Sequence, residues 1–183
     1  MSESSPIKDA LYAEIDRISQ DKINELLLKK EFSVIFQNIF EKAIDKIKEN
    51  VSEDEKVGAL AESLTHYLFT EMLVPSQRKI SYENVELDLV IPNTLELKKN
   101  SQNVIIVLFI KTSDMIEIQK RISQIKTIQQ EDDNIWVISK HLLDISQKSY
   151  ATNKISFVEF LSDAQNFIET KNMNKLNIFK TKM

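Results

Sequence analysis

The sequence predicts an α/β protein that begins with an N-terminal helical hairpin. Apolar residues recur at helical spacing through residues 1–51. The run 104–110 is apolar throughout, as in a strand that is buried on both faces, and helix-like and strand-like segments alternate around it. We therefore divide the chain into an N-terminal helical segment, residues 1–51, and an α/β domain, residues 52–183.

Length and composition limit the class of protein. A chain of 183 residues, of which 42% are apolar and 28% charged, can fill one core and is unlike disordered or membrane chains. The run 104–110 is far shorter than the roughly 20 residues that cross a bilayer as a helix. The chain does not open with a basic segment followed by an apolar one, so we expect no secretion signal and a cytoplasmic protein.

Rare residue types exclude whole classes of site. The chain has no cysteine, which removes disulfides and Cys-based metal centres, and one glycine, which excludes Gly-rich phosphate or dinucleotide loops. The net charge of −4 and the pI of about 5.4 mean that any nucleic-acid binding must be local. The tail 171–183 carries lysines and no acid; we expect a solvated end, with phosphate contacts as the alternative.

The helical segment is expected to form two amphipathic helices, residues 6–30 and 32–51. Such a hairpin is too short to hold a core alone. It should therefore pack on the rest of the chain or pair with its copy in a homodimer. Strict heptads do not persist, which disfavours a coiled coil.

The α/β domain is expected to open with a helix over residues 54–73. Ser52 suits the N-cap, acids follow it in the first turn, and Pro75 ends the helix. Three strands are expected next, at residues 79–82, 85–91 and 103–111, with a polar loop through Asn100 before the last. The remaining elements are expected to be a helix over 114–130, a strand over 134–139, a short strand over 154–157 and a helix over 158–170.

Three charged residues fall on the first helix and on the second and third strands of this domain. They are Glu62, Asp88 within Glu-Leu-Asp-Leu, and Lys111 at the end of Leu-Phe-Ile-Lys. Together with the order helix, strand, strand, strand, helix, strand, they make residues 54–139 resemble the core of the PD-(D/E)xK nuclease superfamily, the restriction-endonuclease-like fold. The resemblance implies a mixed sheet flanked by helices.

The resemblance also implies a catalytic chemistry. In that family an acid on the first helix, an Asp on the second strand and an acid-x-Lys on the third converge on divalent metals. Glu62, Asp88 and Lys111 would be the catalytic residues here, with Mg²⁺ or Mn²⁺ as the cofactor. The carboxylates would hold the metal, the metal would lower the pKa of its bound water, and the lysine would orient that water or the phosphate.

The sequence departs from this pattern at one position. The residue two before Lys111 should be an acid, and it is Phe109, which cannot ligate a metal. Glu86 lies two residues before Asp88 and could supply the missing carboxylate from the neighbouring strand. The metal ligands would then be Asp88, Glu86 and Glu62; the alternative is that Glu86 faces solvent.

Other charged residues near this constellation have two interpretations each. Glu62 and His66 are four residues apart on a helix, so they predict an ion pair or a pair facing a metal. Lys111 could serve the site or extend into solvent. Three polar or basic residues, Gln119, Lys120 and Arg121, follow the third strand, where the resemblance implies contacts with nucleic acid and composition alone predicts a solvated face.

These observations predict a nuclease-fold protein with an incomplete active site, which binds nucleic acid or a protein partner without cleaving. The first alternative is an active Mg²⁺- or Mn²⁺-dependent nuclease with a remodelled site. The second is a structural protein that self-associates through its N-terminal helices.

Overall fold

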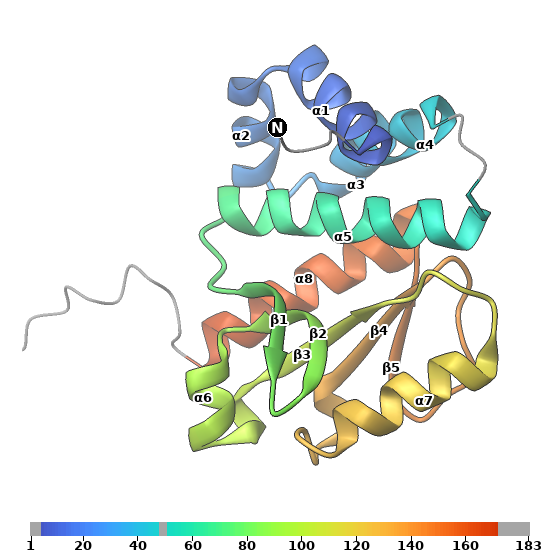
Figure 1. The fold of residues 1–183 in the computed structure, drawn as a ribbon. Helices are drawn as coiled ribbons and strands as arrows, with labels where there is room; N and C mark the ends of the chain where they lie inside the picture. The colour runs from blue at the N-terminus through green and yellow to red at the C-terminus, as the bar shows by residue number, and fades with distance from the viewer. Residues whose placement is uncertain (1–4, 48–50, 172–183) are drawn as a thin grey trace, which may run out of the picture.

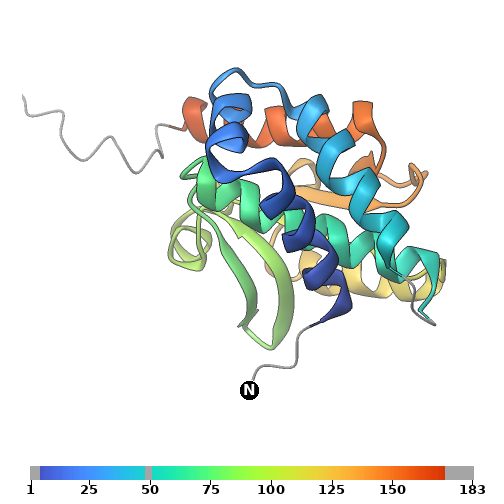
Figure 2. The ribbon, with the colours of Figure 1, turned by 90° about the horizontal axis from the view of Figure 1, so that it is seen from above.

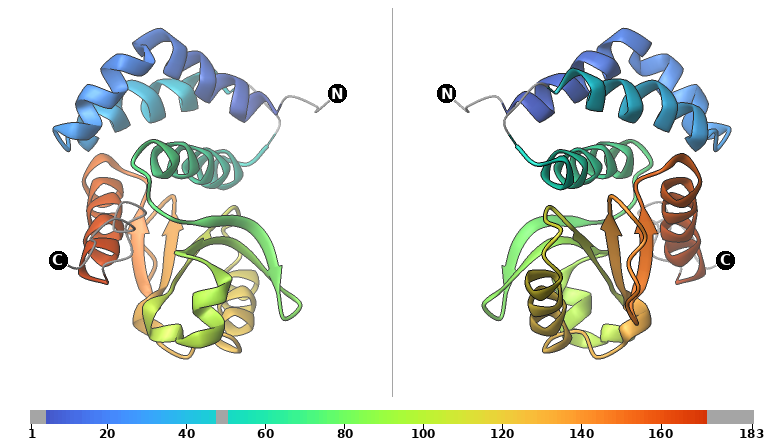
Figure 3. Two further views of the ribbon diagram at one scale, coloured as in Figure 1. Left: turned by 90° about the vertical axis from the view of Figure 1, so that its left-hand side faces the viewer. Right: turned by 90° about the vertical axis from the view of Figure 1, so that its right-hand side faces the viewer.

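The computed structural model describes residues 5–47 and 51–171. It is an α/β protein in which one five-stranded sheet lies between layers of helices (Figure 1). The N-terminal helices form an outer layer over α5 (Glu53–Glu71) and α8 (Lys154–Thr170), and α7 (Met115–Lys126) lies on the other side of the sheet (Figure 3). The expected α/β class, with N-terminal helices packed together, is confirmed.

The sheet is mixed and has the strand order β1-β2-β3-β4-β5. Its strands are β1 Gln77–Tyr82, β2 Val85–Ile91, β3 Ile105–Phe109, β4 Ile135–Ser139 and β5 Lys148–Ala151. The neighbours β1 and β2, and β2 and β3, are antiparallel, whereas β3, β4 and β5 run parallel. The carboxyl ends of these three parallel strands therefore lie along one edge of the sheet.

The N-terminal segment consists of consecutive short helices. They are α1 Pro6–Ile18, α2 Gln20–Leu28, α3 Phe32–Ile35, the π-helical turn η1 Phe36–Glu41 and α4 Lys42–Lys46. The helix expected over 6–30 is interrupted at Ser19, whose φ of 81° ends α1 and whose side chain accepts the N–H of Lys22 to cap α2. The helix expected over 32–51 is one run from α3 to α4 that ends at Lys46, because Ile47 is extended; residues 48–50 of the expected range lie outside the described residues.

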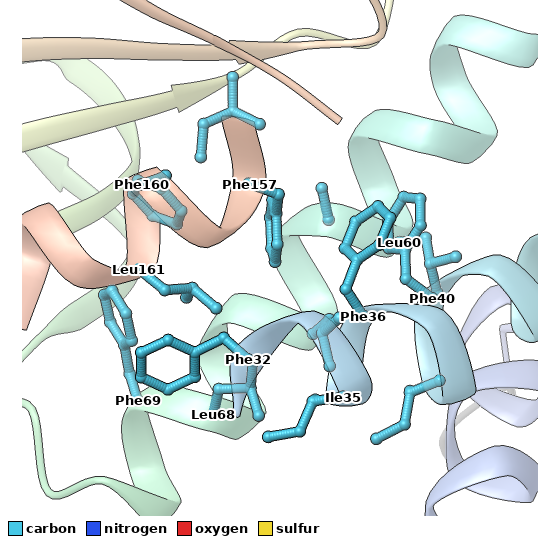
Figure 4. Close-up of a cluster of buried hydrophobic side chains, with 14 of the residues drawn as sticks. Phe32, Ile35, Phe36, Phe40, Leu60, Leu68, Phe69, Phe157, Phe160 and Leu161 are labelled. Carbon is cyan, nitrogen blue, oxygen red and sulfur yellow. The ribbon is translucent and has the colours of Figure 1, made fainter. Parts of the chain in front are cut away.

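The apolar faces of these helices are buried within the chain itself. From above, the N-terminal helices cross over α5 and α8 (Figure 2). Phe36 and Phe40 stack on each other and lie 5.4 and 6.0 Å, between ring centroids, from Phe157 of α8, with Phe32 in the same cluster (Figure 4). The hairpin thus packs on the rest of the chain, one of its two expected outcomes. A homodimer stays a prediction, and it would use a surface other than these apolar faces.

Helix α5 begins and ends as expected. The Ser52 side chain accepts the N–H of Glu55, and the helix ends before Pro75. A Cβ added to Gly58 would lie 2.1 Å from the carbonyl oxygen of Ile110, so only glycine permits this close crossing of helix and strand end. The crossing places Glu62, one turn further along α5, beside the residue that follows Ile110.

Two expectations about local structure are wrong. The polar loop before β3 contains a short helix, α6 (Thr94–Lys99), because Asn93 caps it by accepting the N–H of Glu96, and the 3-10 turn η2 (Ser101–Asn103) follows. The strand expected over 154–157 is the first turn of α8, because the side chain of Asn153 accepts the N–H of Ser156. The strand of this region is β5, and η3 (Asp132–Asn134) precedes β4.

The two faces of the sheet bury separate clusters of apolar side chains. The face beneath α5 and α8 includes Val107 and Phe109, and the face on α7 includes Leu108 and Ile110. Side chains therefore alternate strictly along β3, as the period of a strand requires. Among the described residues, no helix combines the length and the apolar composition that a membrane span needs.

Candidate functional site

Glu62 is the buried acid at the centre of the candidate site. Its side chain is 3% exposed, and its two carboxylate oxygens face different cations. Lys111 Nζ donates to Oε2 at 2.7 Å and Arg78 Nε donates to Oε1 at 2.9 Å, while Lys79 Nζ lies 3.8 Å from the same Oε1. The acid on α5 therefore joins the end of β3 to the start of β1.

These contacts keep Glu62 ionised. Burial raises the pKa of the carboxyl, but the hydrogen bonds and charges of Lys111 and Arg78 outweigh burial and hold the pKa below its ordinary value of 4.5. Because two cations already balance the charge of this buried carboxylate, binding a divalent ion there would require breaking these ion pairs.

Asp88 makes a second, separate ion pair. Its Oδ2 accepts the backbone N–H of Phe109 at 2.9 Å, and Arg121 of α7 donates to Oδ1 at 3.1 Å. The β2–β3 pairing extends only from Ile91 to Leu89, so the amide of Phe109 is left for this side chain. Asp88 of β2 thus binds both β3 and α7 at the point where the β2–β3 pairing ends.

The two acids lie toward opposite faces of the sheet. Lys111 reaches Glu62 on the α5 side, whereas Asp88 reaches Arg121 on the α7 side. Their cations nevertheless meet, because Lys111 and Arg121 both line a hollow of about 160 Å³ beyond the end of β3, together with Glu117. Neither Glu62 nor Asp88 lines this hollow, so the acid that faces it is Glu117.

Glu86 does not join either acid. It is exposed on β2, opposite Ser81 of β1. Leu87 belongs to the cluster on α7 and Leu89 to the cluster beneath α5, so the alternation breaks between them and Glu86 does not share the face of Asp88. The structure leaves Asp88, Glu86 and Glu62 apart, and within residues 5–47 and 51–171 no three His, Cys, Asp or Glu side chains are grouped for a metal ion.

His66 lies one turn beyond Glu62, but no ion pair joins them in the described part of the chain, because Glu62 is bound to Lys111 and Arg78 instead. Partial burial, and then the charge of Arg78, lower the pKa of His66. The expected ion pair is therefore absent among the described residues, and both effects favour the neutral form of the imidazole.

The polar and basic residues predicted on α7 fall into two groups. Gln119 and Lys120 are exposed, in keeping with a solvated face, whereas Arg121 is half-buried against Asp88. Arg78 and its neighbour Lys79 are site residues that the sequence prediction missed. The one signal for them is that two basic residues stand side by side at the start of a strand.

Comparisons of this chain with protein-family models, with curated proteins and with solved structures found no match.

Proposed function

We propose that this chain is a non-catalytic nucleic-acid-binding protein built on a restriction-endonuclease-like core. The order α5, β1, β2, β3, α7, β4 and the mixed sheet, with β3 and β4 parallel, support the choice of core. A shared element order indicates a similar fold but does not establish an activity. Activity must be judged from the residues of the site.

The observation that carries the proposal is the pairing of each candidate metal ligand with internal cations. Glu62 is bound by Lys111 and Arg78, and Asp88 by Arg121 and a backbone amide. A Mg²⁺ site needs carboxylates that converge on one point and retain free oxygens for the ion. The two acids here diverge and their charges are satisfied, so we assign them to structure and not to metal binding.

Local charge supports nucleic acid as the partner. Four cations, Arg78, Lys79, Lys111 and Arg121, outnumber the three acids Glu62, Asp88 and Glu117 by one, so the site is weakly positive although the whole chain carries −4. The side chains of Lys79 and Lys111 are 60% and 36% exposed, which leaves donors free for phosphate oxygens. Such contacts bind the backbone without reading its sequence.

Fluorescence anisotropy with labelled single- and double-stranded DNA and RNA tests the proposal. We expect binding that weakens as salt increases and that falls several-fold in Lys79→Gln/Lys111→Gln. A matched control, Lys98→Gln/Lys99→Gln on α6, removes the same charge at exposed positions away from the site. Equal affinity in both double variants would show that binding occurs elsewhere.

The same samples test the alternative of an active, remodelled nuclease. Incubation of the labelled substrates with Mg²⁺ or Mn²⁺ should yield no products from the native chain. Metal-dependent cleavage that Asp88→Ala and Lys111→Ala both abolish would establish an enzyme and refute the non-catalytic assignment.

A further inference from the structure

A second hollow, of about 730 Å³, lies away from the paired acids, between the N-terminal helices and the sheet domain. One wall is formed by η1, α4 and the start of α5, and the other by the residues at and after the ends of β4 and β5. Its apolar lining consists of Phe36, Phe40, Ile44, Val57, Leu142 and Ala151. Neither Lys111 nor Glu62 lines it.

The location has three properties that are typical of ligand sites. The hollow opens at the carboxyl ends of the parallel strands β4 and β5, and it lies between two parts of the fold. Its volume falls within the range of small-molecule pockets, roughly 300–1,000 Å³. The π-helical turn η1 forms part of its wall, and π-helical turns occur frequently at functional sites.

Charges of opposite sign face the hollow from its two walls. Lys140 and Lys154 lie on the wall after β4 and β5, and Glu41 and Asp45 on the helical wall. Over residues 5–47 and 51–171, none of these four side chains has an oppositely charged partner within 4.0 Å. By contrast, Glu53, which also lines the hollow, is paired with Lys56 at 3.0 Å. Within the described residues these four charges are therefore not held in ion pairs, although the charge of Lys140 also acts on Glu53.

We propose that this hollow binds a mononucleotide, a nucleoside carrying one phosphate group. The phosphate would bind Lys140 and Lys154, and the start of α8 favours negative charge at the same wall. Carboxylates accept hydrogen bonds from ribose hydroxyls, a role that suits Glu41 and Asp45. The base would pack on the apolar lining, where Leu142 is 66% exposed. The absence of Gly-rich loops is no obstacle, because side chains supply each contact.

Isothermal titration calorimetry of the full chain with AMP tests this assignment, with adenosine and inorganic phosphate titrated separately. We expect AMP to bind more tightly than either part, since each part makes only some of the contacts. In Lys140→Gln/Lys154→Gln the affinity for AMP should fall at least about tenfold, because two charge-assisted hydrogen bonds are lost. The affinity for adenosine should not change in that variant.

Two controls separate this site from other effects. Lys8→Gln/Lys99→Gln removes two exposed lysines elsewhere and should leave AMP binding unchanged. Lys79→Gln/Lys111→Gln, which tests the nucleic-acid site, should also leave it unchanged, so either proposal can fail alone. Urea unfolding of each variant confirms that it is folded.

Three outcomes would overturn the assignment. The first is no heat from AMP at concentrations up to about 1 mM, since weaker binding is worth less than about 4 kcal/mol. The second is inorganic phosphate binding as tightly as AMP, which indicates surface lysines only. The third is an equal loss of affinity in Lys140→Gln/Lys154→Gln and in Lys8→Gln/Lys99→Gln.

Discussion

Replacement of Glu62 by Gln distinguishes a structural ion pair from a metal site, because the two predict opposite signs for the change in stability. In a metal site without its ion, neighbouring carboxylates repel one another, so neutralising one of them stabilises the fold. Here Glu62 is held by Lys111 at 2.7 Å and by Arg78 at 2.9 Å. The substitution leaves both cations without their counter-charge, so we expect the variant to be less stable.

The contacts set the magnitude of this loss. A hydrogen bond to a charged group contributes about 1.5–3 kcal/mol, and Glu62 accepts two of them while 3% exposed. Water can solvate part of the two uncompensated cations, because the side chains of Lys111 and Arg78 are 36% and 17% exposed. The amide oxygen of the Gln side chain can also still accept one hydrogen bond. We therefore expect a loss of about 2 kcal/mol, or a Tm lower by about 4–8 °C for a chain of this size.

Urea unfolding followed by fluorescence provides the measurement, since Trp136 is the one tryptophan and is 5% exposed. The pKa of Glu62 is lowered in the folded state, so its contribution is fully present above the ordinary value of 4.5 and is lost as the pH falls through the folded-state pKa. The difference between native chain and variant should therefore shrink below pH 4.5. Glu86→Gln, at an exposed acid, should change stability by no more than about 0.5 kcal/mol.

A Glu62→Gln variant that is as stable as the native chain, or more stable, at pH 7 would contradict a structural ion pair. So would a Tm that Mg²⁺ raises in the native chain and not in Glu62→Gln, because an ion that Glu62 ligates stabilises only the native chain.

Three further predictions concern the surroundings of the site. Asp88→Asn should lower the free energy of unfolding in urea by at most about 1 kcal/mol, because Arg121 is partly exposed and the Asn oxygen can still accept the N–H of Phe109. Asp88→Ala leaves that N–H without an acceptor, so it should lower the free energy of unfolding by about 1–3 kcal/mol more. Gly58→Ala should destabilise the chain by about 1–3 kcal/mol in the same assay, although alanine favours helices, because the new Cβ meets the carbonyl of Ile110; a gain in stability would contradict the close crossing. Removal of residues 1–51 should expose the outer apolar sides of α5 and α8, so the truncated chain should bind a hydrophobic dye and elute as aggregates in size-exclusion chromatography, whereas a folded monomer would show that the helical segment is dispensable.

Local patterns were sufficient to predict most elements of the α/β domain. The strand over 85–91 has the predicted bounds, because alternation of apolar and acidic residues is a local property and Pro92 ends it. The break at Ser19 could not be predicted in the same way, since no glycine or proline marks it. The short helix α6 had a local signal in the Asn93 cap, which the expectation of a loop overlooked.

The partners of the site residues could not be predicted from local patterns. Glu62, Asp88 and Lys111 were each identified by their positions on expected elements. Their pairing depends on where α5 crosses the end of β3, which the contact of Gly58 with Ile110 determines. Sequence periodicity describes which face of an element is apolar but not where two elements cross. For the same reason the prediction placed Arg121 toward nucleic acid, whereas its closest partner is Asp88.

Phe109 stands where the acid-x-Lys pattern has its acid, and its surroundings show that an acid there would not restore a metal site. Its side chain is fully buried in the cluster beneath α5 and α8, on the same face of β3 as Val107. A carboxylate at this position would be enclosed by apolar side chains, and Lys111, two residues further, is already bound to Glu62. The acid that compensates the lysine therefore comes from the helix across the layer and not from the strand, and it joins α5 to the sheet. In this arrangement, restoring the strand acid alone would add a buried charge without creating a metal site.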